Sequence, residues 1–223
     1  MLDWRELRTD LADLVLARSC AGCEAPGSVL CAACWTFLTR GILERELPDG
    51  AVAFAATDYL GVGKSVVLAH KEHGWQVLTP FLGALLARAV TSVTSDAVTL
   101  VPIPPHAHSR ARRGTDPLAD IVRAAIQALR TIGQPATSAS LILRSRDSGA
   151  MKLLGREQRR LAVESSFALS ERSHHIRGQI VVVDDVITTG VTVTEALRTL
   201  VGAGYEVADV ATVASTPLRG LRH

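Results

Sequence analysis

The sequence predicts an α/β fold, in which a parallel sheet is flanked by helices and a small cysteine-rich module comes first. From residue 96 onward, runs typical of strands alternate with patterns typical of helices, as they do in parallel α/β sheets. Residues 180–183 are apolar at consecutive positions, which is expected of a strand covered on both faces. All four cysteines of the chain fall between Cys20 and Cys34. These three observations separate a main α/β domain from a short N-terminal part.

The composition restricts the possible partners only weakly. The 223 residues are enough for one large domain or for a domain with a small appendage. The 24 Lys and Arg exceed the 22 Asp and Glu by a net charge of +2, which gives no general argument for nucleic-acid or membrane binding. No stretch approaches the roughly 20 apolar residues of a membrane helix, and residues 1–20 mix charges through their apolar positions, unlike a secretory signal. We therefore expect a cytoplasmic protein that binds no membrane.

The four cysteines, Cys20, Cys23, Cys31 and Cys34, follow the pattern C-x2-C-x7-C-x2-C. Each C-x-x-C pair can present two thiolates from a tight turn, and four thiolates form the closed tetrahedral shell of a structural zinc site. Disulfides are the alternative reading, but a reducing cytoplasm and the paired spacing argue against them. We therefore predict a structural Zn²⁺ site at these four residues.

The N-terminal module is expected to occupy residues 1–50. Residues 2–17 have apolar positions at helical spacing, and a short helical stretch follows the cysteines at residues 35–46. Pro48, Asp49 and Gly50 form a turn signal that makes a boundary. The main domain is therefore expected over residues 51–223.

The main domain is expected to begin with a strand at residues 51–59. Residues 61–63 predict a hairpin turn into a helix at residues 64–73, and a second helix with one apolar face follows at residues 76–94. The remaining elements are expected, in chain order, as strand 97–103, helix 116–131, strand 140–144, strand 179–186, helix 193–203 and strand 206–214.

The motif with the clearest chemistry is Q-I-V-V-V-D-D-V-I-T-T-G-V-T at residues 179–192. A buried strand delivers two carboxylates at its carboxyl end, where ligands of open α/β sheets bind. A turn rich in hydroxyls follows, and the start of a helix can hold a phosphate with backbone N–H groups. Two adjacent carboxylates can accept hydrogen bonds from the vicinal hydroxyls of a ribose. We predict a ribose-phosphate site at Asp184, Asp185, Val186, Thr188, Thr189, Gly190, Val191 and Thr192.

The local geometry of this motif gives two further expectations. Thr192 and Glu195 have the T-x-x-E spacing of a capping box, which places the helix start at the end of the loop. Neighbouring residues of a strand point to opposite faces, so Asp184 and Asp185 both reach one ligand only at the turn that ends the strand. Gly190 has no side chain to obstruct the approach of an anion.

Two basic stretches are candidates for contacts with a pyrophosphate. The loop after strand 97–103 contains Pro104, Pro105, His106, Arg110 and Arg113. Its prolines stop the strand, and its arginines suit phosphate oxygens. The second stretch contains Lys152, Arg156 and Arg159, which are candidates for a lid that excludes water from a ribosyl centre. Ordinary solvated surface residues are the alternative for each of them.

Residues 61–65, G-V-G-K-S, mimic the end of a nucleotide-binding P-loop. The first glycine of that motif would have to stand at Asp58, so the G-x-x-x-x-G-K-S pattern fails. The sequence therefore predicts a turn into a helix here rather than a nucleotide site.

The motif at residues 179–192 resembles the fingerprint of type I phosphoribosyltransferases. The wider arrangement also includes the four-cysteine module, Tyr59-x-Gly61, Lys71-x-x-Gly74 and a V-P-x-P strand end. Together these features resemble the ComF family of competence-associated proteins, including its GntX-like members. This resemblance covers nearly the full chain. It implies a type I phosphoribosyltransferase-like sheet, with a hood over residues 51–95 and the core over residues 96–223.

The resemblance also implies a ligand and a role. It implies 5-phosphoribosyl pyrophosphate or a related ribose phosphate as ligand, bound with Mg²⁺, and Asp184 and Asp185 as catalytic residues of a phosphoribosyltransferase. The family is associated with DNA uptake, so single-stranded DNA or a DNA-uptake helicase is an expected partner. Two other roles stay open: a non-catalytic DNA-uptake adaptor and a regulator that senses the ligand.

The chain departs from the family pattern at two places. The family usually has R-G-F-N-Q after the proline loop, where this chain has Arg113, Gly114, Thr115, Asp116 and Pro117. The usual T-x-x-Q segment is also replaced in residues 148–162. These differences affect the acceptor and lid roles and leave the phosphate loop intact, so binding is predicted more directly than catalysis.

Overall fold

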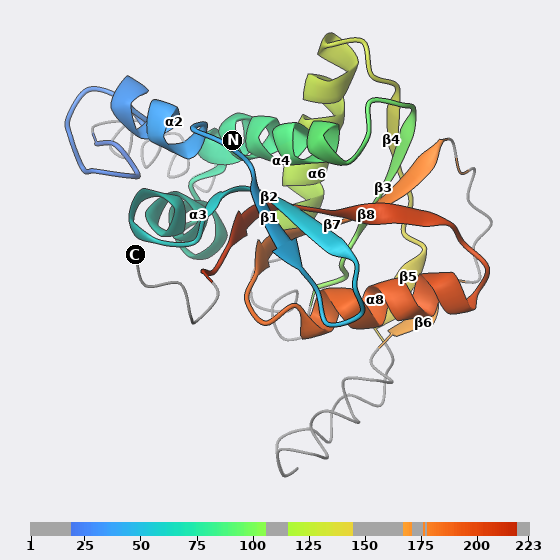
Figure 1. Ribbon diagram of the computed structural model, residues 1–223. Coiled ribbons are helices and arrows are strands. Elements are labelled where there is room, and N and C mark those ends of the chain that lie inside the picture. Colours follow the sequence, from blue (N-terminus) through green and yellow to red (C-terminus); the bar gives the residue numbers. More distant parts are fainter. Residues whose placement is uncertain (1–18, 106–115, 145–166, 171–175, 177, 218–223) are drawn as a thin grey trace, which may run out of the picture.

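A six-stranded sheet covered by helices on both faces forms the centre of the protein (Figure 1). The computed structural model describes residues 19–105, 116–144, 167–170, 176 and 178–217. The strand order is β1-β2-β8-β7-β3-β4, and all neighbouring strands are parallel except β1 and β2. The strands are β1 (Leu43–Glu46), β2 (Val52–Asp58), β8 (Val207–Ser215), β7 (Gln179–Ile187), β3 (Val98–Pro102) and β4 (Ala136–Ser138). The predicted mostly parallel sheet is confirmed.

The central strand β7 is buried on both sides, as its run of apolar residues predicts. Val181 and Val183 belong to one buried cluster, whereas Ile180 and Val182 belong to the other. Alternate residues of a strand point to opposite faces, so these two sets lie on the two faces of the sheet. The position of β7 between β3 and β8 explains why no polar residue interrupts the run.

Different elements cover the two faces. On the face of Val181 lie α3 (Gly61–His73), α4 (Thr79–Val93) and α6 (Pro117–Thr131), with a short 3-10 turn, Gln76–Leu78, before α4. On the face of Ile180 lie α8 (Val191–Gly202) and a two-stranded antiparallel sheet of β5 (Ile142–Arg144) and β6 (Phe167–Leu169). The first face is called the α3 face below, and the second is called the α8 face.

Four local expectations are wrong. The stretch expected to be helical up to residue 46 is a short helix, α2 (Ala32–Leu38), followed by the edge strand β1. A strand of the main sheet was expected at residues 140–144. The sheet instead contains β4 at residues 136–138, and residues 142–144 form β5 in the separate two-stranded sheet. Residues 61–63 are the first turn of α3 rather than a hairpin turn. Helix α8 begins at Val191, two residues before its expected start.

The cysteine-rich part packs directly on the α3 face. Cys20, Leu30, Cys34 and Leu38 belong to the same buried cluster as the apolar faces of α3 and α4. Trp35 also contacts Phe81 of α4 edge to face, with 5.6 Å between ring centroids. The division at residue 50 stays a prediction, although β1 on its N-terminal side pairs with β2. The helix expected at residues 2–17 lies outside the described residues.

One segment, Gln76–Val93, is long and apolar enough to cross a membrane by length and composition alone, and 44% of it is buried inside the protein. Its residues Leu82, Leu85 and Leu86 are fully buried among α6 and the sheet. Helices of a protein core have the same composition, and this packing assigns α4 to the core. The cytoplasmic location stays a prediction.

Candidate functional site

The strand order reverses at β3 and β7. These two strands are neighbours, but the chain continues from β3 to β4 on one side and from β7 to β8 on the other. In open α/β sheets, ligands bind where the strand order reverses in this way, because the loops that follow the two strands separate there. The residues after β3 and β7 are therefore the first candidates for a ligand site.

Asp184 and Asp185 are both inside β7, because the strand continues to Ile187. The expectation that the strand would turn at these residues is therefore wrong, and pleating directs the two carboxylates toward opposite faces. The backbone N–H of Asp185 donates to Asp184 Oδ1 at 2.8 Å. The two acids thus lie side by side at the end of the strand, each with its own surroundings.

Asp185 is buried on the α3 face and paired with a lysine. Its Oδ2 lies 2.6 Å from Lys71 Nζ of α3, and its side chain is only 11% exposed. Burial lowers the pKa of Lys71, but the charges of Asp185 and Asp184 outweigh burial, so the pKa is raised. Burial and the charge of Asp185 raise the pKa of Tyr59, against the lowering effect of Lys71. Tyr59 therefore lies close enough to Lys71 and Asp185 for their charges to change its pKa.

Asp184 is partly buried on the α8 face, where Arg144 is its nearby cation. Burial, followed by the charge of Asp185, raises the pKa of Asp184 to about 8. The charge of Arg144 lowers the pKa of Asp184 and so opposes this shift. Burial lowers the pKa of Arg144, and the charge of Asp184 partly offsets that lowering. Arg144 is held by its Nε, which donates to Pro104 O at 2.9 Å, and by the ring of Phe167, 5.0 Å from its Cζ. Each acid therefore has a cation on its own face of the sheet.

The loop after β7 presents hydroxyls at the start of α8. Thr188 and Thr189 are exposed, and Gly190 follows with φ +84°, a left-handed conformation that favours glycine. Thr216, just after β8, donates from Oγ1 to Thr188 O at 2.9 Å. Arg45 of β1 donates to Thr216 O at 3.3 Å. The backbone of the loop is thus braced by neighbouring strands while its hydroxyls face outward.

The N-terminus of α8 has no side-chain cap, so its first N–H groups are available to an anion. The expected capping box of Thr192 and Glu195 is wrong, because Gly190 is the N-cap and Thr192 lies inside the first turn. Glu195 is buried, with its Oε2 3.7 Å from Arg198 Nε, a distance that marks a weak ion pair within the helix. The helix therefore starts closer to β7 than the sequence predicts.

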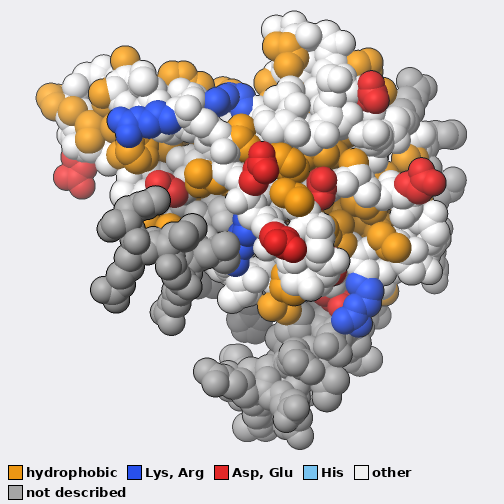
Figure 2. Space-filling view, viewed as in Figure 1, with side chains coloured by type: hydrophobic (Ala, Val, Ile, Leu, Met, Phe, Trp, Pro, Cys, Tyr) orange, Lys and Arg blue, Asp and Glu red, His pale blue; other side chains and the backbone are white. Residues whose placement is uncertain are grey.

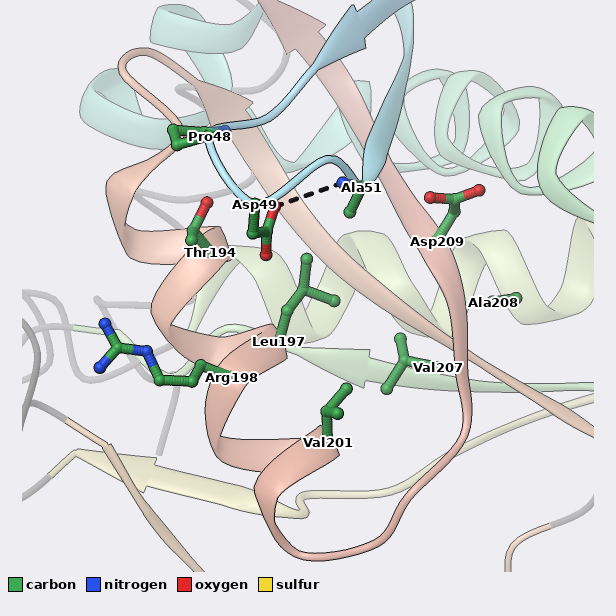
Figure 3. A pocket seen from close by; sticks show the side chains of 10 residues that line it. All are labelled: Pro48, Asp49, Ala51, Thr194, Leu197, Arg198, Val201, Val207, Ala208 and Asp209. Atoms are coloured by element: carbon green, nitrogen blue, oxygen red, sulfur yellow. Dashed lines mark hydrogen bonds between the residues drawn. The ribbon is translucent and has the colours of Figure 1, made fainter.

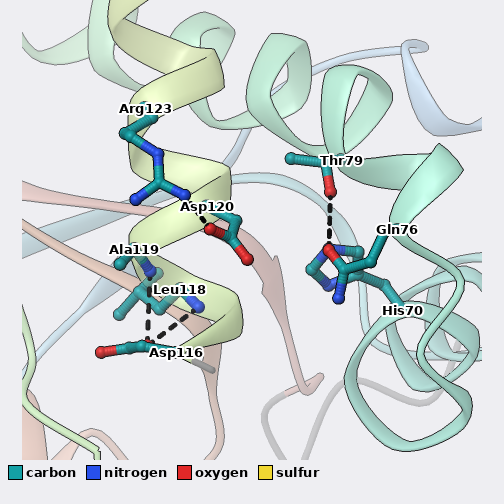
Figure 4. Close-up of polar contacts among 8 residues, drawn as sticks. All are labelled: His70, Gln76, Thr79, Asp116, Leu118, Ala119, Asp120 and Arg123. Carbon is teal, nitrogen blue, oxygen red and sulfur yellow. Dashed lines mark hydrogen bonds and ion pairs between the residues drawn. The ribbon is translucent and has the colours of Figure 1, made fainter. Parts of the chain in front are cut away.

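Helix α6 gives a useful contrast, because it follows β3 at the same edge of the sheet (Figure 4). Its N-cap, Asp116, accepts hydrogen bonds at Oδ1 from the N–H groups of Leu118 and Ala119, at 3.2 and 3.3 Å. A carboxylate already occupies the position that an anion would take, and it repels a phosphate. Among these two helices, only α8 offers an uncapped N-terminus.

The predicted pyrophosphate and lid residues are only partly described. Pro104 and Pro105 follow β3 directly, and Pro104 contacts Arg144 as described above. The other candidates, His106, Arg110, Arg113, Lys152, Arg156 and Arg159, lie outside the described residues, so their roles stay predictions.

The P-loop mimic at residues 61–65 has a packing explanation. A Cβ on Gly63 would lie 2.1 Å from Asp58 O, so this glycine lets the first turn of α3 pack on the end of β2. Lys64 is exposed on the same helix. The glycine therefore serves helix packing, and the lysine lies on the solvated surface.

The four cysteine sulfurs form a second candidate site. Their Sγ atoms all lie within 4.8 Å of one another, close enough to bind one metal ion, and Cys23 Sγ and Cys31 Sγ are 3.7 Å apart. The N–H groups of Gly22 and Cys31 donate to Cys20 Sγ at 3.4 and 3.3 Å. Four thiols in this arrangement fit a tetrahedral zinc site with no open coordination position.

The surroundings of Cys20 favour a thiolate. Burial raises its pKa, but the backbone N–H groups of Cys31, Cys23 and Gly22 outweigh burial and lower the pKa to about 6. Gly22 also allows the close approach of the module to α3, because a Cβ there would lie 2.8 Å from both Cys34 Sγ and Val62 Cγ1. The cysteine site is thus fixed against the helix that carries Lys71.

A pocket of about 570 Å³ lies between the β1–β2 turn, the outer side of α8 and the start of β8 (Figure 3). Leu197, Val201 and Val207 give it an apolar floor, with Arg198 and Asp209 at its edges. Asp209 is engaged, since its Oδ1 accepts from the Val52 N–H at 2.8 Å. The pocket contains none of the predicted site residues.

The described residues on the face shown in Figure 2 give no separate argument for nucleic-acid binding. On the face shown in Figure 2, the Lys and Arg side chains of the described residues are scattered among acidic and apolar ones and form no continuous patch. Extended basic grooves are the usual electrostatic feature of nucleic-acid binding proteins. DNA binding therefore stays a prediction that rests on the resemblance.

Three residues that complete the acidic site were not among the predicted site residues: Lys71, Tyr59 and Arg144. Lys71 and Tyr59 do belong to the short motifs Tyr59-x-Gly61 and Lys71-x-x-Gly74, which were the available signal. Arg144 is the last residue of β5 and precedes the second basic stretch, whose candidates Lys152, Arg156 and Arg159 come later in the sequence. Their contribution arises from tertiary contacts with β7 that no local pattern encodes.

Comparisons with known proteins add no assignment. A scan against models of protein families finds no family that matches the chain, and a search of curated proteins finds no significant relative. The functional argument therefore rests on the site itself.

Proposed function

We propose that this protein binds 5-phosphoribosyl pyrophosphate or a related ribose phosphate at the carboxyl end of β7. The observation that carries the proposal is the combination of two adjacent carboxylates with the uncapped N-terminus of α8, separated by the loop at residues 188–190. A ribose phosphate has vicinal hydroxyls that a carboxylate can accept hydrogen bonds from and a phosphate that the start of a helix can bind. The location at the reversal of strand order supports the same reading.

In this proposal, the 5-phosphate binds the backbone N–H groups at the start of α8 and the hydroxyls of Thr188 and Thr189. Gly190 lets the loop adopt the left-handed turn that starts α8, and its missing Cβ leaves room for Leu47 beside that turn. Pleating directs Asp184 and Asp185 to opposite faces of β7, so both can accept hydrogen bonds from the hydroxyls of one ribose only when the end of the strand turns on binding. Pyrophosphate oxygens are hard ligands for Mg²⁺, so we include Mg²⁺ as a companion of a pyrophosphorylated ligand.

Transfer of the phosphoribosyl group is the activity that best fits such a ligand, and we propose it as the reaction. The chain contributes the electrostatics: its carboxylates face the ring on which positive charge develops, which favours an oxocarbenium-like transition state. A role in DNA uptake, with single-stranded DNA or a helicase as partner, remains part of the proposal through the ComF resemblance. The four-cysteine site would bind structural zinc and take no part in the chemistry.

Calorimetric titration of ribose 5-phosphate tests the binding proposal. We expect saturable binding to the wild-type protein and at least about tenfold weaker binding when Thr188 and Thr189 are both replaced by Ala, because each lost hydrogen bond to a charged group is worth roughly 1.5–3 kcal/mol. Ser65→Ala is the matched control, since Ser65 is an exposed hydroxyl on α3. Absence of binding to the wild type, or equal binding by the threonine variant, would contradict the proposal.

Release of pyrophosphate from 5-phosphoribosyl pyrophosphate, measured with a panel of nucleobase acceptors, tests the transfer reaction separately. Turnover that disappears in Asp185→Asn supports it. A protein that binds the ligand but releases no pyrophosphate with any acceptor would instead fit the regulator that senses its ligand.

A further inference from the structure

The pocket between the β1–β2 turn, α8 and β8 has the size and the lining of a small-molecule site. Its volume of about 570 Å³ lies within the range of about 300–1,000 Å³ that is usual for such sites. Leu197, Val201 and Val207 form its apolar floor (Figure 3), and Val201 is 59% exposed. Covering these side chains removes apolar surface from water, which favours a ligand with an apolar body.

Two carboxylates at the rim of this pocket are fixed in place but not neutralised. Asp49 Oδ1 accepts from the Ala51 N–H at 3.4 Å, and Asp209 Oδ1 accepts from the Val52 N–H at 2.8 Å (Figure 3). No Lys or Arg among the described residues forms an ion pair with either acid. A carboxylate has two oxygens that can each accept more than one hydrogen bond, so both acids retain acceptors for a further donor. The rim therefore suits a positively charged group.

Arg198 is the cationic residue of the lining, and it does not face these acids. Its Nε lies 3.7 Å from Glu195 Oε2 within α8. Figure 3 shows its guanidinium directed away from Leu197 and from both carboxylates. An anion on the apolar floor would thus be repelled by the two acids without a cation beside it. The charge of the pocket favours a cation over an anion.

Thr194 gives the pocket lining a buried polar atom without a partner. Its Oγ1 is buried and has no hydrogen-bond partner within the part of the chain that the structure describes. Figure 3 shows this hydroxyl pointing toward the turn that carries Asp49. Buried hydroxyls are nearly always hydrogen-bonded, so an exception needs a physical reason. A donor on a bound ligand supplies the missing partner.

We infer that this pocket is a further binding site, one that takes small organic cations with an apolar body and an ammonium or amidinium group. The apolar body lies on Leu197, Val201 and Val207. The cationic group lies at the rim, where Asp49 or Asp209 accepts a charge-assisted hydrogen bond from it. This inference does not depend on the proposed function, because the pocket contains none of the residues predicted to bind a ribose phosphate.

Three probes that share one apolar body and differ in the head group test the inference. 4-Phenylbutylamine, 4-phenylbutanol and 4-phenylbutyrate carry a positive, a neutral and a negative head group at neutral pH. Each is titrated into the full-length protein, and the methyl resonances of Leu197, Val201 and Val207 are followed by two-dimensional NMR. The resonances that shift locate the bound probe, and the titration curve gives its affinity.

Three variants are compared with the wild type. The rim variant, Asp49→Asn with Asp209→Asn, removes both charges and keeps an oxygen for each backbone N–H. Val201→Lys places a cation on the floor at an exposed position. The matched control, Glu44→Gln with Asp96→Asn, removes two exposed acids that do not line the pocket. The melting temperature confirms that each variant folds.

The expected result is a preference for the amine that depends on the rim. In the wild type, the amine shifts the floor methyl resonances saturably and binds about fivefold more tightly than the carboxylate, which is the upper end of the effect of an exposed ion pair. The alcohol lies between them. The rim variant binds all three probes with similar affinity, Val201→Lys no longer binds the amine, and the control matches the wild type.

Four results would overturn the inference. The first is the absence of saturable shifts with any probe, and the second is equal or tighter binding of the carboxylate by the wild type. The third is a set of shifts that excludes the floor methyl groups, because the amine would then bind elsewhere. The fourth is equal loss of the amine preference in the rim variant and the control, since the overall charge of the protein would then explain it.

Discussion

The two candidate sites of this protein are assembled in opposite ways. The cysteine site takes all its ligands from residues 20–34 and its geometry from local N–H···S contacts. The acidic site brings together β7, α3, β5 and the loop after β7, which are far apart in the sequence. The first can be recognised from spacing alone, whereas the second depends on the finished sheet. Changes at the two sites should therefore have different consequences.

The largest effect on stability is expected from loss of the metal. Cys20→Ser removes one of four ligands and leaves three thiols crowded at the edge of the core, so we expect the bound zinc to fall from about one per chain to near zero. The free energy of unfolding should fall by several kcal/mol. Elemental analysis and thermal melting check this outcome, with Thr36→Ala on the exposed side of α2 as control. Full zinc content in Cys20→Ser would contradict the proposed ligand set.

Gly22 tests whether the two sites communicate through α3. An alanine there places a Cβ 2.8 Å from Cys34 Sγ and Val62 Cγ1, and such overpacking costs about 1–3 kcal/mol. Because α3 also carries Lys71, we expect weaker binding of 5-phosphoribosyl pyrophosphate in the folded variant. The control is Gly41→Ala, where a Cβ meets nothing within 4 Å and the backbone is not left-handed. Lower stability with unchanged affinity would show that the sites are independent.

The raised pKa of Asp184 predicts a pH dependence opposite in sign to that of the cysteine site, where the pKa of Cys20 is lowered to about 6. A carboxyl whose pKa is about 8 in the folded protein and near 4 when unfolded keeps its proton better in the folded state. Stability is therefore expected to fall as the pH rises from about 4 to 8, by on the order of 1–2 kcal/mol after allowance for partial exposure. Urea unfolding of wild type and Asp184→Asn across this range measures it. An identical pH dependence in the variant would contradict the assignment.

Alanine substitutions at Gly190 and Gly204 distinguish the cost of backbone strain from an effect on ligand binding. Replacement by Ala at φ +84° should cost about 1–2 kcal/mol, the usual penalty of the left-handed region. Gly204, at the other end of α8, has φ +85° with nothing within 4 Å of an added Cβ, whereas a Cβ on Gly190 would lie 3.0 Å from Leu47 Cδ2, so Gly204→Ala should have the backbone cost alone and Gly190→Ala a somewhat larger one. We expect only Gly190→Ala to weaken ribose 5-phosphate binding. Equal affinities in both variants would place the phosphate elsewhere.

Periodicity and spacing predicted much of the fold. The apolar run of β7, the amphipathic α6 and the four-cysteine spacing each depend on neighbouring residues, and the structure agrees with them. The misplaced elements are short. Residues 43–46 carry charges that suit an exposed edge strand, and β4 has three residues, so tertiary pairing decided both.

Only part of the acidic site could be predicted, because local patterns identify contiguous residues but not tertiary contacts. Asp184, Asp185 and Gly190 stand in one contiguous motif, so the sequence could identify them as a unit. Lys71 and Arg144 reach the carboxylates only because α3 and β5 pack on opposite faces of β7. The capping-box prediction failed because Gly190 adopts the left-handed conformation and starts α8 early, which T-x-x-E spacing cannot reveal.

A crystal structure of the protein with 5-phosphoribosyl pyrophosphate and Mg²⁺ tests the central claim most directly. The account predicts the 5-phosphate on the N–H groups at the start of α8, and the end of β7 turned so that both Asp184 and Asp185 contact the ribose hydroxyls. A ligand bound in the pocket beside Leu197 and Val207, with the Lys71–Asp185 ion pair intact and the start of α8 free, would contradict it.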